Sequence, residues 1–151
     1  MTRVLLATAV AIVGLASALP AAAQFQKPED AVKYRQSAMF VMGNHMGRLG
    51  AMVQGRVPFD AAQAAANAEV ILAMSRLPFA GFTEASASIN SKAKPEVWTD
   101  RAKFDAGAQR MQEAVVKLND AAKSGNADQL KAAFGPVGQA CKACHDTYWK
   151  Q

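Results

Sequence analysis

The chain has 151 residues, of which 51% are hydrophobic and 19% charged, so it has the length and apolar content of one compact domain rather than of a disordered segment. Its formal net charge is +5, from 17 basic and 12 acidic residues, and no two Lys or Arg residues are adjacent, which argues against a nucleic-acid-binding protein. The two cysteines, Cys141 and Cys144, are too close together to cross-link distant parts of a fold.

The first 23 residues predict a secretory signal peptide that is cleaved before Gln24. Arg3 precedes a predominantly apolar stretch, residues 4–19, and Ala21 and Ala23 supply the small residues of an A-x-A cleavage site. The alternative is a retained membrane anchor, but the apolar stretch is short for a bilayer span and no basic stop-transfer cluster follows it. The mature domain, residues 24–151, then has 128 residues (151 − 23) and a net charge of +4, because Arg3 is lost. We expect it to be exported to a bacterial periplasm, without a membrane anchor.

The first helix is predicted over residues 28–53. Pro28 is a favoured first-turn residue, and apolar side chains then recur in a seven-residue pattern that defines one buried face. The positions of this face are Val32, Met39, Met42, Met46, Leu49 and Val53. Residues 54–59 follow as a loop.

The second helix is predicted to begin at Asp60, because Asp60 and Gln63 have the spacing of a capping box, and to end at Pro78. Its expected buried face consists of Ala66, Val70, Met74 and Leu77. Residues 79–95 are rich in Ser, Gly, Ala and Asn and show no clear period, so they predict a long crossover loop.

Two further helices are predicted, over about residues 99–123 and from Asn126 to near the C-terminus. A Ser-Gly pair separates them, and Asn126 and Gln129 have the spacing of an N-cap. In both helices the apolar residues are spaced 4, 3, 4, 3, 4. In the first they are Phe104, Ala108, Met111, Val115, Leu118 and Ala122. In the second they are Leu130, Phe134, Val137, Cys141, Cys144 and Tyr148. Within the last helix, the pair Gly135 and Pro136 predicts a kink or a brief break.

An average spacing of about 3.5 residues between apolar positions is typical of helices that pack side by side at shallow angles. Four such helices with short connections predict an all-α fold, an antiparallel up-and-down four-helix bundle. No segment shows the alternation that would favour a β-strand.

Residues 141–145 have the sequence CKACH, that of a c-type haem attachment site, in which two thiols add to the haem vinyl groups and the histidine binds the iron. On a helix, Cys141, Cys144 and His145 share one face, so all three can reach the same macrocycle. A thioredoxin-like pair is one alternative, but that motif belongs to an α/β context and needs no following histidine. A zinc site is another, but three ligands lack a partner cluster. We therefore expect one covalent haem c per chain, enclosed by the bundle.

From residue 24 onward the chain resembles cytochrome c′ over essentially its whole length. The resemblance rests on Gln24-Phe25 and Lys27-Pro28-Glu29-Asp30-Ala31-Val32 at the start, Tyr34-Arg35-Gln36 in the first helix, Pro95-Glu96-Val97-Trp98 before the third, and Phe134-Gly135 through the CxxCH sequence. It implies a bundle around one haem with five-coordinate, high-spin iron, whose open side admits NO or CO and excludes many other ligands. It also implies a two-fold homodimer, for which the first two helices have free faces.

The resemblance places Arg35, Gln36 and Met39 among the cofactor-binding residues. Arg35 also lies close to the buried face of the first helix, where an arginine needs an anion; a haem propionate is the expected one, and a solvent-reaching side chain at the bundle rim is the alternative. Met39 is expected over the open side of the iron, either as a steric plug or, through its sulfur, as a sixth ligand.

Other residues near these positions have less specific interpretations. Met42 and Met46 are expected to pack in the core, and His45, the only other histidine, to lie beside the buried face without binding iron. Trp149 departs from the family pattern, because it stands four residues after His145, where the family commonly carries Arg or Lys. The resemblance therefore implies less about NO binding on the His145 side of the haem.

The sequence thus predicts a haem protein that binds small gases and undergoes one-electron redox, and that is not an enzyme. A low-spin electron carrier with a methionine sixth ligand is the alternative. Enzymatic NO reduction or peroxidation needs a distal proton donor, and the first helix offers no acid or histidine on the face of Met39. The mild positive charge is expected to favour encounters with an acidic redox partner protein.

Overall fold

The computed structural model describes residues 24–150, and the predicted signal peptide lies outside this range. Four long helices make up most of the chain: α1 (Pro28–Val53), α2 (Ala61–Met74), α4 (Arg101–Lys123) and α5 (Ala127–Tyr148). Two short 3₁₀ helices, η1 (Leu77–Gly81) and η2 (Glu84–Ser88), and the one-turn helix α3 (Glu96–Thr99) lie between α2 and α4.

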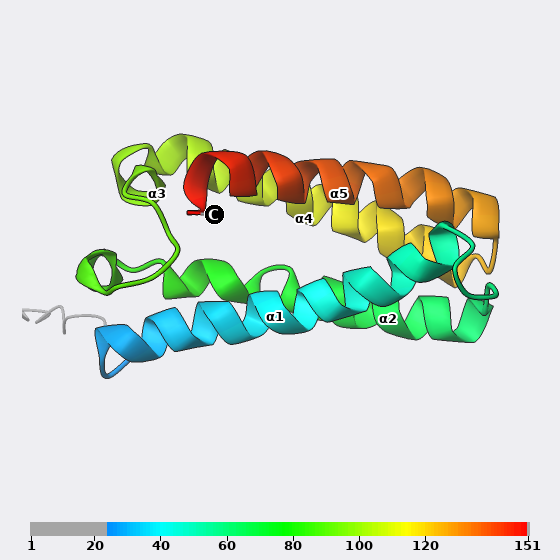
Figure 1. Cartoon of the computed structure of the whole chain (residues 1–151), viewed down its shortest axis with the longest axis horizontal. Helices are drawn as coiled ribbons and strands as arrows, with labels where there is room; N and C mark the ends of the chain where they lie inside the picture. The colour runs from blue at the N-terminus through cyan, green and yellow to red at the C-terminus, as the bar shows by residue number, and fades with distance from the viewer. Residues whose placement is uncertain (1–23, 151) are drawn as a thin grey trace, which may run out of the picture.

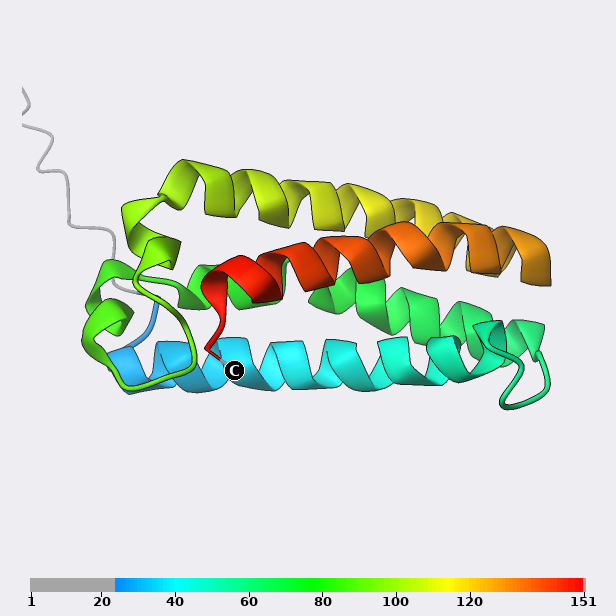
Figure 2. The ribbon, with the colours of Figure 1, turned by 45° about the horizontal axis from the view of Figure 1, so that its top comes forward.

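The four long helices form an antiparallel up-and-down bundle, which confirms the predicted fold class. Each long helix runs opposite to the one before it, with α1 beside α2 and α4 beside α5 (Figure 1, Figure 2). Contacts also join α2 to α4 and α1 to α5, so the four helices close around one core. The connection between α2 and α4 lies at the same end of the bundle as the end of α5 (Figure 1). Within residues 24–150, no helix combines the length and apolarity needed to cross a membrane.

The predicted buried faces of three helices are largely confirmed. In α4 all six predicted positions, from Phe104 to Ala122, are buried. In α5 Leu130 and Val137 are buried, and the other predicted positions are half-buried. The predicted face of α1 alternates in the same way between buried residues and half-buried ones. A seven-residue period was therefore sufficient to orient these helices.

Both predicted N-caps are also confirmed. The carboxylate of Asp60 accepts the N–H of Gln63 at 3.0 Å. The side-chain oxygen of Asn126 accepts the N–H groups of Asp128 and Gln129 at 2.9 and 3.0 Å. These bonds satisfy first-turn donors that have no partner inside the helix.

The buried face of α2 differs from the predicted one. Ala66 is exposed and Leu77 lies beyond the helix, whereas the residues buried from α2 are Ala64, Asn67, Ala68 and Ile71. Alanine occurs on every side of this helix, so its apolar period is ambiguous. Asn67 is tolerated in the core because its amide donates to the carbonyl of Gln63 at 2.6 Å and its Oδ1 pairs with His45 Nδ1 at 2.8 Å.

Of the kink or brief break predicted in the last helix, the break is wrong, because α5 continues from Ala127 to Tyr148 with Pro136 inside it. Gly135 and Pro136 both lie on the exposed side of the helix. A proline there forfeits one backbone hydrogen bond, but the carbonyl groups that its ring crowds can tilt towards water. The attachment residues therefore sit on one continuous helix.

The helix predicted to end at Pro78 ends at Met74, and residues 79–95, predicted as a loop, contain part of η1 and all of η2. The short helix α3 then precedes α4, which begins at Arg101. η1 lies so close to α1 that a Cβ on Gly81 would be 2.5 Å from the carbonyl oxygen of Ala31 and 2.9 Å from Cβ of Arg35. Only glycine fits this approach without a shift of the backbone. The contact fixes the connection against the part of α1 that carries Arg35.

Candidate functional site

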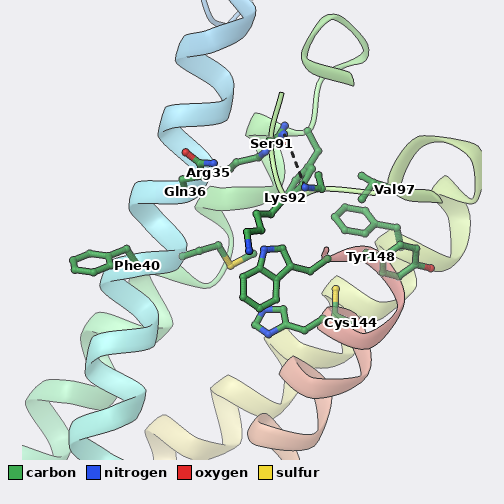
Figure 3. Close-up of a pocket in the computed structure, with 14 residues that line it drawn as sticks. Arg35, Gln36, Phe40, Ser91, Lys92, Val97, Cys144 and Tyr148 are labelled. Atoms are coloured by element: carbon green, nitrogen blue, oxygen red, sulfur yellow. Dashed lines mark hydrogen bonds between the residues drawn. The ribbon is translucent and has the colours of Figure 1, made fainter. Parts of the chain in front are cut away.

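A cavity opens near the end of the bundle where the α2–α4 connection meets the end of α5 (Figure 3). Its outer lobe has a volume of about 400 Å³ and its inner lobe about 260 Å³, and Met39, Cys144 and His145 border both lobes. α1 forms one wall, α4 and α5 form another, and residues 91–93 border the outer lobe. Among the described residues that line the lobes there is no Asp or Glu.

The last turns of α5 place the predicted attachment residues on one side of this cavity. Cys141 borders the inner lobe, while Cys144 and His145 border both lobes. Burial raises the pKa of the Cys141 and Cys144 thiols, so both are protonated at neutral pH. The imidazole of His145 is exposed at the cavity, with its ring centroid 5.2 Å from that of Trp149. Two neutral thiols and an imidazole thus share one helix face, as the spacing predicted.

Arg35 is buried, with 3% of its surface exposed, and all its hydrogen-bond partners are neutral. Its Nη1 donates to the carbonyl of Gly81 at 2.7 Å and to Ser86 Oγ at 2.8 Å, and its Nη2 donates to Ser91 Oγ at 3.0 Å. The guanidinium lies 4.4 Å from the ring centroid of Phe82. Burial lowers the pKa of Arg35, and none of the ion pairs among the described residues includes it. A buried cation without a carboxylate is unfavourable, so the outer lobe offers a place for an anion.

The remaining predicted residues of α1 have different relations to the cavity. Gln36 is exposed at the outer lobe, and Met39 is half-buried between the two lobes. Met42 is buried in the core and Met46 packs against it, as expected, and both also border the inner lobe. His45 bonds to α2 and does not line either lobe.

Comparison with known proteins identifies the family of the chain. Residues 30–149, which include the whole cavity lining, match the family model described as Cytochrome C′. The chain belongs to the cytochrome c′ family. The cofactor of this chain is accordingly one covalently attached haem c.

The relatives match over nearly their full length. The chain is 51% identical over 128 residues to cytochrome c′ from Alcaligenes xylosoxydans xylosoxydans, which covers 85% of this chain and 99% of that protein. The crystal structure of cytochrome c′ from Rubrivivax gelatinosus matches with a TM-score of 0.82 at 47% identity, covering 84% of this chain and 100% of that one. A nitric oxide complex of a mutant cytochrome c prime from Alcaligenes xylosoxidans matches with a TM-score of 0.80 at 50% identity, covering 85% and 99%.

The cavity of this chain fits a haem. Gly43 on the α1 wall and Gly138 on the α5 wall border the inner lobe, and nothing lies within 4 Å of the place that a Cβ would take on either. These two positions leave room for a flat macrocycle between the helices. The apolar inner lobe suits the porphyrin, and Arg35 at the outer lobe suits a carboxylate.

Among the polar residues of the outer lobe, sequence reasoning missed Ser91 and Lys92. They belong to a segment without periodicity, and no local pattern relates them to α5. An isolated antiparallel bridge joins Ala93 to Trp149, and the N–H of Lys150 donates to the carbonyl of Lys92 at 2.7 Å. This long-range pairing brings Ser91 and Lys92 to the cavity.

Trp149, the departure from the cytochrome c′ pattern, borders the outer lobe beside His145. Its side chain is 44% exposed, and Lys92 Nζ lies 5.4 Å from its ring centroid. A large aromatic ring therefore lies beside His145, where the resemblance implied a basic side chain.

Proposed function

We propose that this member of the cytochrome c′ family binds small neutral gases such as NO and CO and exchanges one electron, and that it is not an enzyme. The observation that carries the proposal is the position of Met39, which borders both lobes of the cavity from α1 while His145 borders both from α5. A thioether is a bulky apolar group, so this arrangement favours a restricted gas site over a site for polar ligands.

The described residues have the following proposed roles. Cys141 and Cys144 would hold the haem by thioether bonds, and His145 would bind its iron. Arg35 pairs with a propionate, and Gln36 lies at the same edge. When bound, the haem would supply one-electron redox chemistry and an iron able to bind a diatomic gas.

The inner lobe supports the choice of neutral diatomic ligands. Apart from the thiols and imidazole of α5, its lining is apolar: Met39, Met42, Gly43, Met46, Phe79, Gly107, Ala108, Met111, Gly138 and Ala140. α1 and α4 therefore offer no side-chain donor there to stabilise a charged ligand or to protonate a bound one. Similar solved structures include nitric oxide complexes of cytochrome c prime variants from Alcaligenes xylosoxidans, which is consistent with the same ligand here.

Titration of the ferrous protein with CO tests this proposal. We expect the wild type to be high-spin and to bind CO, and Met39→Ala to bind CO faster while its resting ferrous iron stays five-coordinate. Met52→Ala is the matched control, because Met52 lies on the same helix but borders neither lobe. If instead the wild type is low-spin and becomes high-spin only in Met39→Ala, Met39 is a ligand and the protein is an electron carrier.

We also propose that the mature protein begins at Gln24, is periplasmic, and forms a two-fold homodimer through α1 and α2. The predicted signal peptide and the free faces of these helices support this. The intact mass of the protein recovered from the periplasmic fraction tests the cleavage site and the location, and its mass in sedimentation tests the homodimer.

A further inference from the structure

Two groups besides Arg35 can bind an anion at the outer lobe. Lys92 extends from the 91–93 segment into the space between α1 and the end of α5 (Figure 3). Its ammonium lies 5.4 Å from the ring centroid of Trp149, and none of the ion pairs among residues 24–150 includes it. The contact of the Lys92 ammonium with the ring of Trp149 is weaker than an ion pair with a carboxylate would be.

The hydroxyl of Ser91 is the second group. Its oxygen accepts the Nη2–H of Arg35 at 3.0 Å and the N–H of Ala93 at 3.3 Å. A serine oxygen has two acceptor positions and one proton, so these two bonds leave the proton available for donation. Because Ser91 borders the outer lobe, an acceptor placed there would meet this donor beside two cations.

We propose that Ser91 and Lys92 complete, together with Arg35, a site for the two carboxylates of the haem at the outer lobe. Arg35 is buried and already donates three hydrogen bonds to neutral acceptors, so it has few N–H groups left to bind two carboxylates. The Lys92 ammonium, which forms none of the ion pairs among residues 24–150, and the hydroxyl proton of Ser91 supply the missing donors at the same lobe. This inference rests on the proposed haem site and adds two binding residues to it.

Lys94 is the natural comparison for Lys92, since both belong to the segment paired with the end of α5. Lys94 Nζ donates to the main-chain carbonyl of Asp146 at 3.0 Å, and Lys94 does not border the lobe. The two lysines therefore contribute the same charge to the same end of the molecule, and only one of them borders the lobe.

The experiment compares Lys92→Gln, Lys92→Arg, Ser91→Ala and the control Lys94→Gln in the purified holoprotein, in chloride buffer. Loss of a cation beside the haem carboxylates favours the ferric state, so we expect Lys92→Gln to lower the reduction potential more than Lys94→Gln, and Lys92→Arg to restore it. The propionate bending band in the resonance Raman spectrum should shift in Lys92→Gln and in Ser91→Ala, and should stay unchanged in Lys94→Gln.

Equal potential shifts in the two glutamine variants, or an unshifted propionate band in both Lys92→Gln and Ser91→Ala, would overturn the inference. So would a difference between wild type and Lys92→Gln that appears only when inorganic phosphate is added, because the site would then hold a solution anion. Failure of the haem site itself is distinct: the wild type would lack covalent haem before any variant is compared.

Discussion

Replacement of Arg35 by leucine should destabilise the protein and change its reduction potential. The change removes two buried hydrogen bonds from the guanidinium, to the carbonyl of Gly81 and to Ser86 Oγ. Hydrogen bonds to a charged group contribute about 1.5–3 kcal/mol each. Leucine offsets part of this loss, because it keeps apolar contact with Phe82 and because the buried cation no longer has to be desolvated. We expect the free energy of unfolding to fall by about 2–3 kcal/mol, which lowers Tm by on the order of 10 °C.

The matched control is Arg101→Leu. Arg101 forms an ion pair with Asp105 at 2.9 Å, in which the two side chains are 41% and 53% exposed, and donates to the carbonyl of Phe82 at 3.0 Å. The exposed ion pair contributes little and the hydrogen bond to Phe82 is only partly buried, so the control should lose less stability than Arg35→Leu, about 1 kcal/mol. Thermal unfolding followed by circular dichroism, with potentiometric titration of the haem, measures both effects. Equal losses of stability and equal shifts of potential in the two variants would refute the assignment of Arg35 to the haem site.

Three further predictions concern the attachment of the haem and the glycines. Haem should remain with the polypeptide after acid–acetone extraction, and a variant with serine at both cysteines should release it, because only thioether bonds resist this treatment. Gly81→Ala should lower the free energy of unfolding by about 1–3 kcal/mol, because the new Cβ would lie 2.5 Å from the carbonyl oxygen of Ala31. In the control Gly47→Ala, where nothing lies within 4 Å of the new Cβ, the free energy of unfolding should rise by up to about 1 kcal/mol. Denaturant titrations measure both changes. Gly138→Leu should fill the inner lobe and lower the haem-to-protein ratio, while Gly135→Leu, on the exposed side of the same helix, should not.

The fold was predictable wherever large apolar and charged residues alternate with a clear period. In α4 the apolar positions are separated by charged and polar ones, and all six predicted positions are buried. In α2 alanine occurs on both sides of the helix, so the pattern did not distinguish the face of Ala64 and Ile71 from that of Ala66. The sequence also could not show that Pro136 lies on the exposed side of α5, where a proline is tolerated without a break.

The candidate site was predictable to the extent that its residues form local patterns. The attachment residues Cys141, Cys144 and His145 occupy one helical turn, and Arg35 lies next to a periodic buried face. Ser91 and Lys92 could not be found in this way, because the bridge between their segment and Trp149 joins parts of the chain more than 50 residues apart. Such pairings depend on tertiary structure and leave no periodic signal in the sequence.

The central proposal is that His145 would be the only protein ligand of the haem iron and that Met39 would not bind it. The absorption spectrum of the purified ferrous protein, recorded without added ligand, tests it most directly. The account predicts a five-coordinate, high-spin spectrum that changes to that of a six-coordinate complex when CO is added. A low-spin spectrum before any ligand is added would contradict the account.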